Sequence, residues 1–188
     1  MSMASPDPVT APSEYQRLML SLVGEDDPAS VQEETPGAVT AMIATAAADL
    51  RRRPAESEWS VLELVGHLAD AELVMAARYR WVLAHEEPPI AAYDQDRWVD
   101  RLRHNEDDPR DLLALFEPLR RANLALWRRT PGPARQRVGL HSERGRESLD
   151  LMFRMIAGHD RFHLAQMDRT LRAIRVEASV KPESIGSS

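Results

Sequence analysis

The stretch SLDLMFRMIAGHDRFHLAQMDRTLRAIR, residues 148–175, contains the longest helical pattern in the sequence. On a helical wheel at about 100° per residue, apolar side chains gather on one face and arginines on the opposite face. The first face comprises Leu149, Met152, Ile156, His159, Asp160, His163, Gln166, Met167, Thr170 and Ile174. The pattern predicts a long helix with one buried face, and it places His159 and His163 inside that face.

Start and stop signals predict three further long helices. Ser60-Val-Leu-Glu63 is a capping box, and Thr35-Pro36 and Asp108-Pro109 each pair a capping residue with proline at the first helical position. Pro54 ends the first of these helices. The four long helices are expected at 36–53, 60–84, 109–129 and 148–175, and they predict an all-α bundle.

The remaining sequence connects these helices within one domain. The connections are predicted to be a short helix at 14–23, an acidic loop at 24–34, a short helix at 94–104 and a polar loop that ends at Gly145. No alternating β-strand pattern extends beyond a few residues. A single domain is therefore expected over residues 13–175, with flexible tails at 1–12 and 176–188.

Composition excludes several classes of function. The chain of 188 residues has 0 cysteines, which excludes disulfides, thiolate metal sites and a thiol nucleophile of its own. Its net charge of −6 argues against binding to a nucleic-acid backbone. The sequence shows no secretory signal and no apolar run long enough to span a membrane, so a cytoplasmic protein without nucleic-acid or membrane partners is expected.

Three histidines are candidates for a metal site. His159 and His163 are separated by four positions, so their Cβ atoms lie about 6 Å apart on one helix face, where both rings can bind one divalent ion. His67 lies at the border of the apolar face of the 60–84 helix and offers a third ring. The alternatives are an accidental pair of core histidines and a boundary residue. Three neutral imidazoles would leave a coordination position open, as in catalytic sites.

Several segments together resemble the DinB/YfiT-like metal-binding superfamily. They are residues 59–72, with WSVLELVGHLADAE, residues 93–98, with YDQDRW, residues 141–145, with HSERG, and residues 159–166, with HDRFHLAQ. The resemblance implies an up-down-down-up four-helix bundle. It also implies that His67, His159 and His163 bind zinc, nickel or a similar ion. Relatives include transferases and isomerases that use bacillithiol or mycothiol.

Other polar residues lie within reach of these histidines. Asp70 and Asp160 are candidates for a catalytic base or for orienting the ligands, although Asp160 can equally form an outward salt bridge with an arginine. Gln166 is a further candidate for orienting a ligand. The candidates for substrate contacts are Tyr93, Asp94, Arg97, His141 and Gln166, but Asp94 can also act only as a helix cap. His85 and His104 are expected to be structural or solvated.

Three functions remain open at this stage. The first is a metal-dependent transferase that joins a low-molecular-weight thiol to a small electrophile, and the absence of cysteine requires that the thiol be a cosubstrate. The second is a hydrolase that uses water at the same metal. The third is a non-catalytic bundle that stores or senses metal or takes part in a stress response. A small-molecule substrate is expected for the enzymes, and a homodimer is possible through the helix faces.

Overall fold

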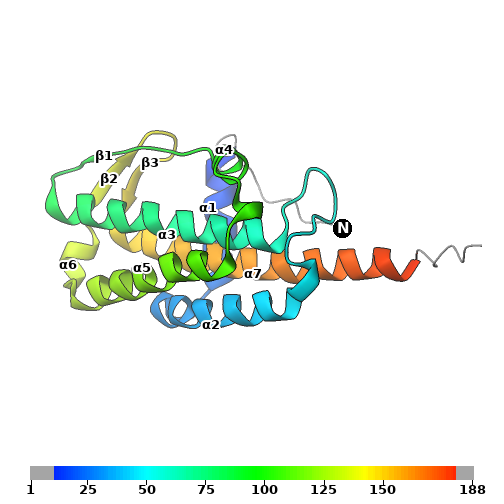
Figure 1. Ribbon diagram of the computed structural model, residues 1–188. Coiled ribbons are helices and arrows are strands. Elements are labelled where there is room, and N and C mark those ends of the chain that lie inside the picture. Colours follow the sequence, from blue (N-terminus) through cyan, green and yellow to red (C-terminus); the bar gives the residue numbers. More distant parts are fainter. Residues whose placement is uncertain (1–10, 181–188) are drawn as a thin grey trace, which may run out of the picture.

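The computed structural model describes residues 11–180 and contains a four-helix bundle (Figure 1). The long helices are α2 (Pro28–Ala46), α3 (Val61–Ala84), α5 (Pro109–Arg129) and α7 (Leu149–Val180). In Figure 1, α2 and α7 run in one direction and α3 and α5 in the other, so the predicted up-down-down-up order is confirmed. None of the helices in the described part of the chain is long and apolar enough to cross a membrane.

Smaller elements cover the sides of the bundle. Helix α1 (Pro12–Val23) packs across α7. A three-stranded sheet, in the order β1-β2-β3, lies where α3 ends and α7 begins. The remaining elements are β1 (Pro89–Ile90), β2 (Val138–His141), β3 (Gly145–Ser148), α4 (Gln95–Arg101), α6 (Gly132–Arg135) and the 3₁₀ turns η1 (Ala47–Asp49) and η2 (His104–Glu106).

The start of the first long helix was predicted wrongly. Helix α2 begins at Pro28 with Asp27 as its cap, inside the predicted acidic loop, and Pro36 lies in the helix interior. Proline cannot donate to the carbonyl four residues earlier, and this normally breaks a helix. Here the freed carbonyl of Gln32 accepts a 3.1 Å hydrogen bond from Nη1 of Arg120 on α5. The neighbouring helix therefore replaces the missing bond.

Other boundaries also differ from the prediction. The predicted polar loop before α7 contains the antiparallel hairpin β2-β3, in which Val138 pairs with Ser148. Gly145, the first residue of β3 after the hairpin turn, has a φ of 76°, a backbone conformation that glycine adopts without strain. Helix α7 continues to Val180 through the first part of the predicted tail, and α1 begins at Pro12 rather than at residue 14. Residues 1–10 and 181–188 lie outside the described residues.

Two large apolar clusters of the bundle have polar groups between them, and a third, small cluster joins α1 and α2 to α7. One cluster, near the sheet, includes Tyr79, Trp127 and Phe153, and the other includes Phe116 and Met167. Between them, the buried residues of α3, α5 and α7 are mostly polar: His67, Asp70, Glu72, Arg120, Asn123, His159, Asp160 and His163. Burying a polar side chain without a partner is costly, so these side chains are expected to have hydrogen-bond, ionic or metal partners.

Candidate functional site

The three histidines predicted as metal ligands come together in this polar layer. His67 lies on α3, and His159 and His163 lie one turn apart on α7. One ring nitrogen from each lies within 4.8 Å of those from the other two, and Nε2 of His67 is 2.9 Å from Nε2 of His159. All three side chains are buried. Two helices thus bring three imidazoles together in one small space.

Burial keeps these rings neutral at physiological pH. It lowers the pKa of His67 and of His159 well below 6.5, and repulsion between the rings adds to the effect. Burial also lowers the pKa of His163 to about 4, although its hydrogen bond to Gln166 opposes this change. A neutral imidazole has one nitrogen lone pair available, which is the form that binds metals.

The hydrogen bonds of the cluster fit a divalent cation. Nδ1 of His163 donates to Oε1 of Gln166 at 2.9 Å, which leaves Nε2 available as a ligand. Nδ1 of His159 is buried without a hydrogen-bond partner. Neutral imidazoles whose Nε2 atoms converge, as those of His67 and His159 do at 2.9 Å, are suitable donors for zinc or nickel. The arrangement therefore suits metal binding better than a purely structural cluster.

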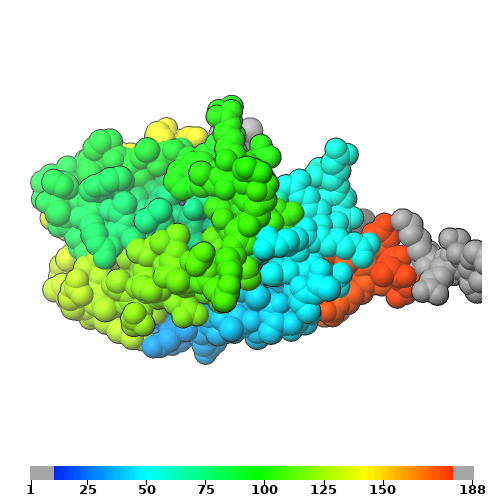
Figure 2. Space-filling model, in the orientation of Figure 1, coloured from blue at the N-terminus to red at the C-terminus, as the bar shows by residue number. Residues whose placement is uncertain are grey.

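Two glycines bring outer segments against the helices that carry these histidines. A Cβ atom on Gly158 would lie 1.9 Å from the backbone oxygen of Met19, so α1 can cross α7 only because this residue is glycine. A Cβ on Gly66 would lie 2.4 Å from the ring of His104. Figure 2 shows the green segment that contains α4 and η2, both of which contact α3, lying across the front of the bundle. The residue before His67 and the residue before His159 both permit close packing.

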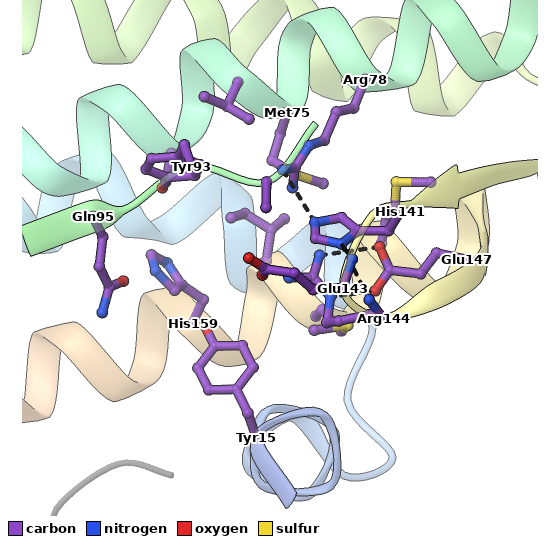
Figure 3. Close-up of a pocket in the computed structure, with 16 residues that line it drawn as sticks. Tyr15, Met75, Arg78, Tyr93, Gln95, His141, Glu143, Arg144, Glu147 and His159 are labelled. Atoms are coloured by element: carbon purple, nitrogen blue, oxygen red, sulfur yellow. Dashed lines mark hydrogen bonds and ion pairs between the residues drawn. The ribbon is translucent and has the colours of Figure 1, made fainter. Parts of the chain in front are cut away.

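A pocket opens beside His159 (Figure 3). It is bounded by α1, α3, α7, the β2-β3 hairpin and the segment before α4, and its empty space is about 700 Å³, which includes open solvent at its mouth. Its polar lining includes Tyr15, Arg78, Tyr93, His141, Glu143 and Arg144. A small molecule that enters the pocket can reach the histidine cluster at His159.

The residues predicted to contact substrate separate into three groups. Tyr93 and His141 line the pocket. Gln166 contacts His163. Asp94 and Arg97 are not part of the pocket lining formed by residues 11–180: the Asp94 side chain accepts from the backbone N–H of Arg97 at the start of α4, and the two side chains form an exposed ion pair at 3.0 Å. Asp94 therefore acts as a helix cap here.

The two aspartates predicted near the ligands bind other partners. Oδ2 of Asp70 lies 2.7 Å from Nε2 of His104, whose Nδ1 lies 2.8 Å from Oδ2 of Asp107. The hydrogen bond to Asp70 raises the pKa of His104, although partial burial opposes this effect. His104 is therefore a buried partner of Asp70 rather than a solvated residue.

Asp160 forms an ion pair that points into the protein rather than outward. Arg120 donates to both oxygens of Asp160, and its Nε donates to Oε2 of Glu72 at 2.9 Å. All three side chains are at most 1% exposed. Although burial opposes the charged form, the two carboxylates raise the pKa of Arg120 above its ordinary value. This network joins α3, α5 and α7 beside the histidines.

Sequence reasoning missed the charged groups of the pocket wall. Arg78 follows His67 on α3 by 11 positions, which is about three turns and places both residues on the same helix face. This spacing is a usable signal for Arg78. Arg144 and Glu147 form an ion pair within the hairpin, with Nε 2.5 Å from Oε1, and no helical periodicity could indicate it.

Comparison with known proteins agrees with this fold. The sequence pattern of the DinB superfamily matches residues 30–167. A solved structure of YfiT from Bacillus subtilis, described as a probable metal-dependent hydrolase with an unusual four-helix bundle topology, superposes with a TM-score of 0.74 at 24% sequence identity. The match covers 80% of this chain and 87% of that chain, and it supports the bundle architecture.

Curated relatives have the same kind of name. A protein of Oceanobacillus iheyensis called "Putative metal-dependent hydrolase OB0413" is 25% identical over 63% of this chain and 68% of its own length. A second protein of that organism, OB0782, is 28% identical over 58% of this chain and 63% of its own length. The YfiT sequence is 34% identical over 37% of this chain and 39% of its own length. The extent of the family match shows that the chain belongs to the DinB superfamily.

Proposed function

We propose that this protein is a divalent-metal-dependent enzyme that acts on a small molecule held in the pocket beside His159. The observation that carries the proposal is the cluster of three buried, neutral imidazoles, from His67, His159 and His163, at the edge of an open pocket. An enclosed structural metal site would have no use for such an opening. Zinc or nickel fits the three nitrogen donors.

A bound divalent ion would supply a Lewis-acidic centre that lowers the pKa of a coordinated water or thiol. The chain's own residues hold and shield that centre. Gln166 fixes the ring of His163, as described above. The ring of Trp59 lies 5.1 Å from that of His67, and the ring of Phe162 lies 5.1 Å from that of His163, so aromatic groups exclude water on these sides.

Glu143 is the candidate proton acceptor on the pocket wall. Its carboxylate has no ion-pair partner among residues 11–180, whereas Glu147 is paired with Arg144. Asp70 and Asp160 are not given this role in the proposal, because their carboxylates are bound to His104 and Arg120. They instead position the helices that carry the histidines.

The nucleophile distinguishes two versions of the proposal. The names of the relatives support hydrolysis, in which water adds to a small substrate and the leaving group takes up a proton. The second version is transfer to a low-molecular-weight thiol of the bacillithiol or mycothiol type. The absence of cysteine favours a thiol cosubstrate if sulfur is the nucleophile, because the chain cannot supply one itself.

Metal analysis and a substrate panel test this function. Protein purified without a histidine tag should contain about one equivalent of zinc or nickel, and His163→Ala should lose it, whereas the control variant His85→Ala, at an exposed helix end, should retain it. Metal-dependent turnover of small esters and amides without thiol supports the hydrolase, and turnover that requires thiol supports the transferase. Metal binding without turnover in either assay contradicts the enzymatic proposal.

A further inference from the structure

Arg78 is a buried cation without an anionic partner among the described residues. Its side chain is 5% exposed, and its Nε atom is buried without a hydrogen-bond partner. Nη2 donates to the carbonyl oxygen of Ala91 at 2.7 Å, and Nη1 contacts the sulfur of Met75 at 3.8 Å. Neither group carries a negative charge, so no carboxylate is paired directly with the guanidinium among the described residues.

The second buried arginine of the bundle shows how unusual this is. Arg120 is 1% exposed and is paired with the carboxylates of both Glu72 and Asp160. The two acidic groups on the pocket wall do not provide such a pair for Arg78: Glu147 is bound to Arg144, and Glu143 is exposed. Burial lowers the pKa of Arg78, and repulsion from Arg144 adds to this effect. An anion that entered the pocket would relieve both costs.

His141 provides a second donor at the same place. Its Nδ1 accepts from the backbone N–H groups of Glu143 at 3.2 Å and Arg144 at 3.3 Å. Burial lowers the pKa of His141 to about 4, so the ring is neutral, and because Nδ1 accepts from two N–H groups we assign the single ring hydrogen to Nε2. That Nε2 faces Nη2 of Arg78 at 3.3 Å (Figure 3). Two donors then face each other, and an oxygen anion beside them would accept from both.

These donors share a pocket with the histidine cluster but lie at a distance from it. Because Arg78 follows His67 by 11 positions on one helix face, their Cα atoms are about 16 Å apart along α3. The side chain of a helical residue leans toward the helix N-terminus, which here is toward His67. The pocket wall between them is apolar and includes Val74, Met75 and Ile156.

We propose that Arg78 and Nε2–H of His141 bind a carboxylate of the substrate and that an apolar segment of the substrate connects this carboxylate to the reacting group beside His159. The statement about the reacting group rests on the proposed function, whereas carboxylate binding can be tested without it. A carboxylate is favoured over a phosphate dianion because Arg78 supplies one positive charge and Glu143 and Glu147 lie nearby. The substrate class is therefore a small, elongated carboxylic acid.

Hexanoate is a suitable probe because it joins one carboxylate to a short apolar chain, and hexanamide is its uncharged counterpart. In protein labelled with ¹⁵N-arginine, the Nε–H signal of Arg78 is assigned by its loss in Arg78→Lys. Hexanoate should shift this signal, and hexanamide should not. Because Arg78→Met removes a hydrogen bond between charged groups, it should weaken hexanoate binding by about 10- to 100-fold. The affinity is measured from backbone chemical shifts of the pocket residues.

Matched variants make the outcome decisive. Arg78→Lys keeps the charge and should retain part of the affinity for hexanoate. If Arg78→Met does not fold, His141→Phe provides the replacement test, and it should also weaken hexanoate binding. Arg172→Met, which removes an exposed arginine of α7, should bind hexanoate like the wild type. Equal binding of hexanoate and hexanamide, unchanged affinity in Arg78→Met, or no shift of the Arg78 signal would overturn the proposal.

The metal-free variant His163→Ala separates the two proposals. His163 is not among the residues that line the pocket within the described chain, so this variant should lose metal but still bind hexanoate. Failure of the metal proposal would therefore leave the carboxylate result readable. Loss of hexanoate binding by Arg78→Met with unchanged metal content would likewise support the carboxylate site on its own.

Discussion

Replacement of Arg120 by methionine should strongly destabilise the bundle. Arg120 is the only cation bound to the buried carboxylates of Glu72 and Asp160 within residues 11–180, and all three groups are at most 1% exposed. Methionine keeps most of the side-chain volume but leaves two negative charges uncompensated. Breaking a buried ion pair in this way costs about 3–5 kcal/mol. In a protein of this size, such a loss lowers Tm by roughly 6–20 °C.

Urea denaturation followed by circular dichroism, in the presence of a chelator, measures this effect without a contribution from metal. The control is Arg128→Met, which removes an exposed ion pair with Glu33 and should cost less than about 1 kcal/mol. Adding Glu72→Gln and Asp160→Asn to Arg120→Met should recover part of the loss, because those changes remove the uncompensated charges. If Arg120→Met were no less stable than Arg128→Met, the assigned role of the network would be refuted.

Three further predictions follow from the same structure. His159→Ala should abolish metal binding. Wild-type protein at a free metal concentration of about 100 Kd should melt about 5–10 °C above its chelated form. An equal rise in the variant would contradict the assignment of this ligand. The raised pKa of His104 means that its ionic stabilisation is complete below pH about 6.5 and is lost as pH rises through the higher folded-state pKa. His104→Gln should therefore cost more stability at pH 6 than at pH 9 in urea denaturation. A pH-independent cost would count against the pair with Asp70. Gly158→Ala should destabilise the protein by about 1–3 kcal/mol because its Cβ meets the α1 backbone. Gly37→Ala on α2, whose Cβ meets nothing within 4 Å, should be neutral or stabilising. Parallel thermal melts compare the two variants.

The helices could be predicted wherever their signals are local. The capping box at Ser60 is present in the structure, and the periodicity of residues 148–175 identified α7. The start of α2 could not be chosen in this way, because Asp27-Pro28 and Thr35-Pro36 carry the same signal. The choice depends on Arg120, which donates to the carbonyl that Pro36 leaves free and is separated from it by 88 positions. The β2-β3 hairpin was missed because four-residue strands are too short to show a period.

In the candidate site, too, local sequence signals identified some residues but not their partners. His159 and His163 could be identified from one helix, and His67 from the border of another. The partners of the polar residues could not, since pairing depends on which helix faces which. Asp160 binds a residue 40 positions away, and Asp70 binds one 34 positions away. Residue type and spacing predict which side chains point inward, but tertiary packing determines what each inward side chain meets.

Helix α1 contributes a wall of the pocket from outside the part of the chain that the superfamily pattern matches. It carries Tyr15 into the pocket and ends before residue 30, where the match to the superfamily pattern begins. The histidine cluster lies inside the shared region, and this wall lies outside it. Because Tyr15 lies on this wall and the three histidines do not, a substitution at Tyr15 should alter the shape of the molecule that the pocket admits while leaving the three ring nitrogens in place.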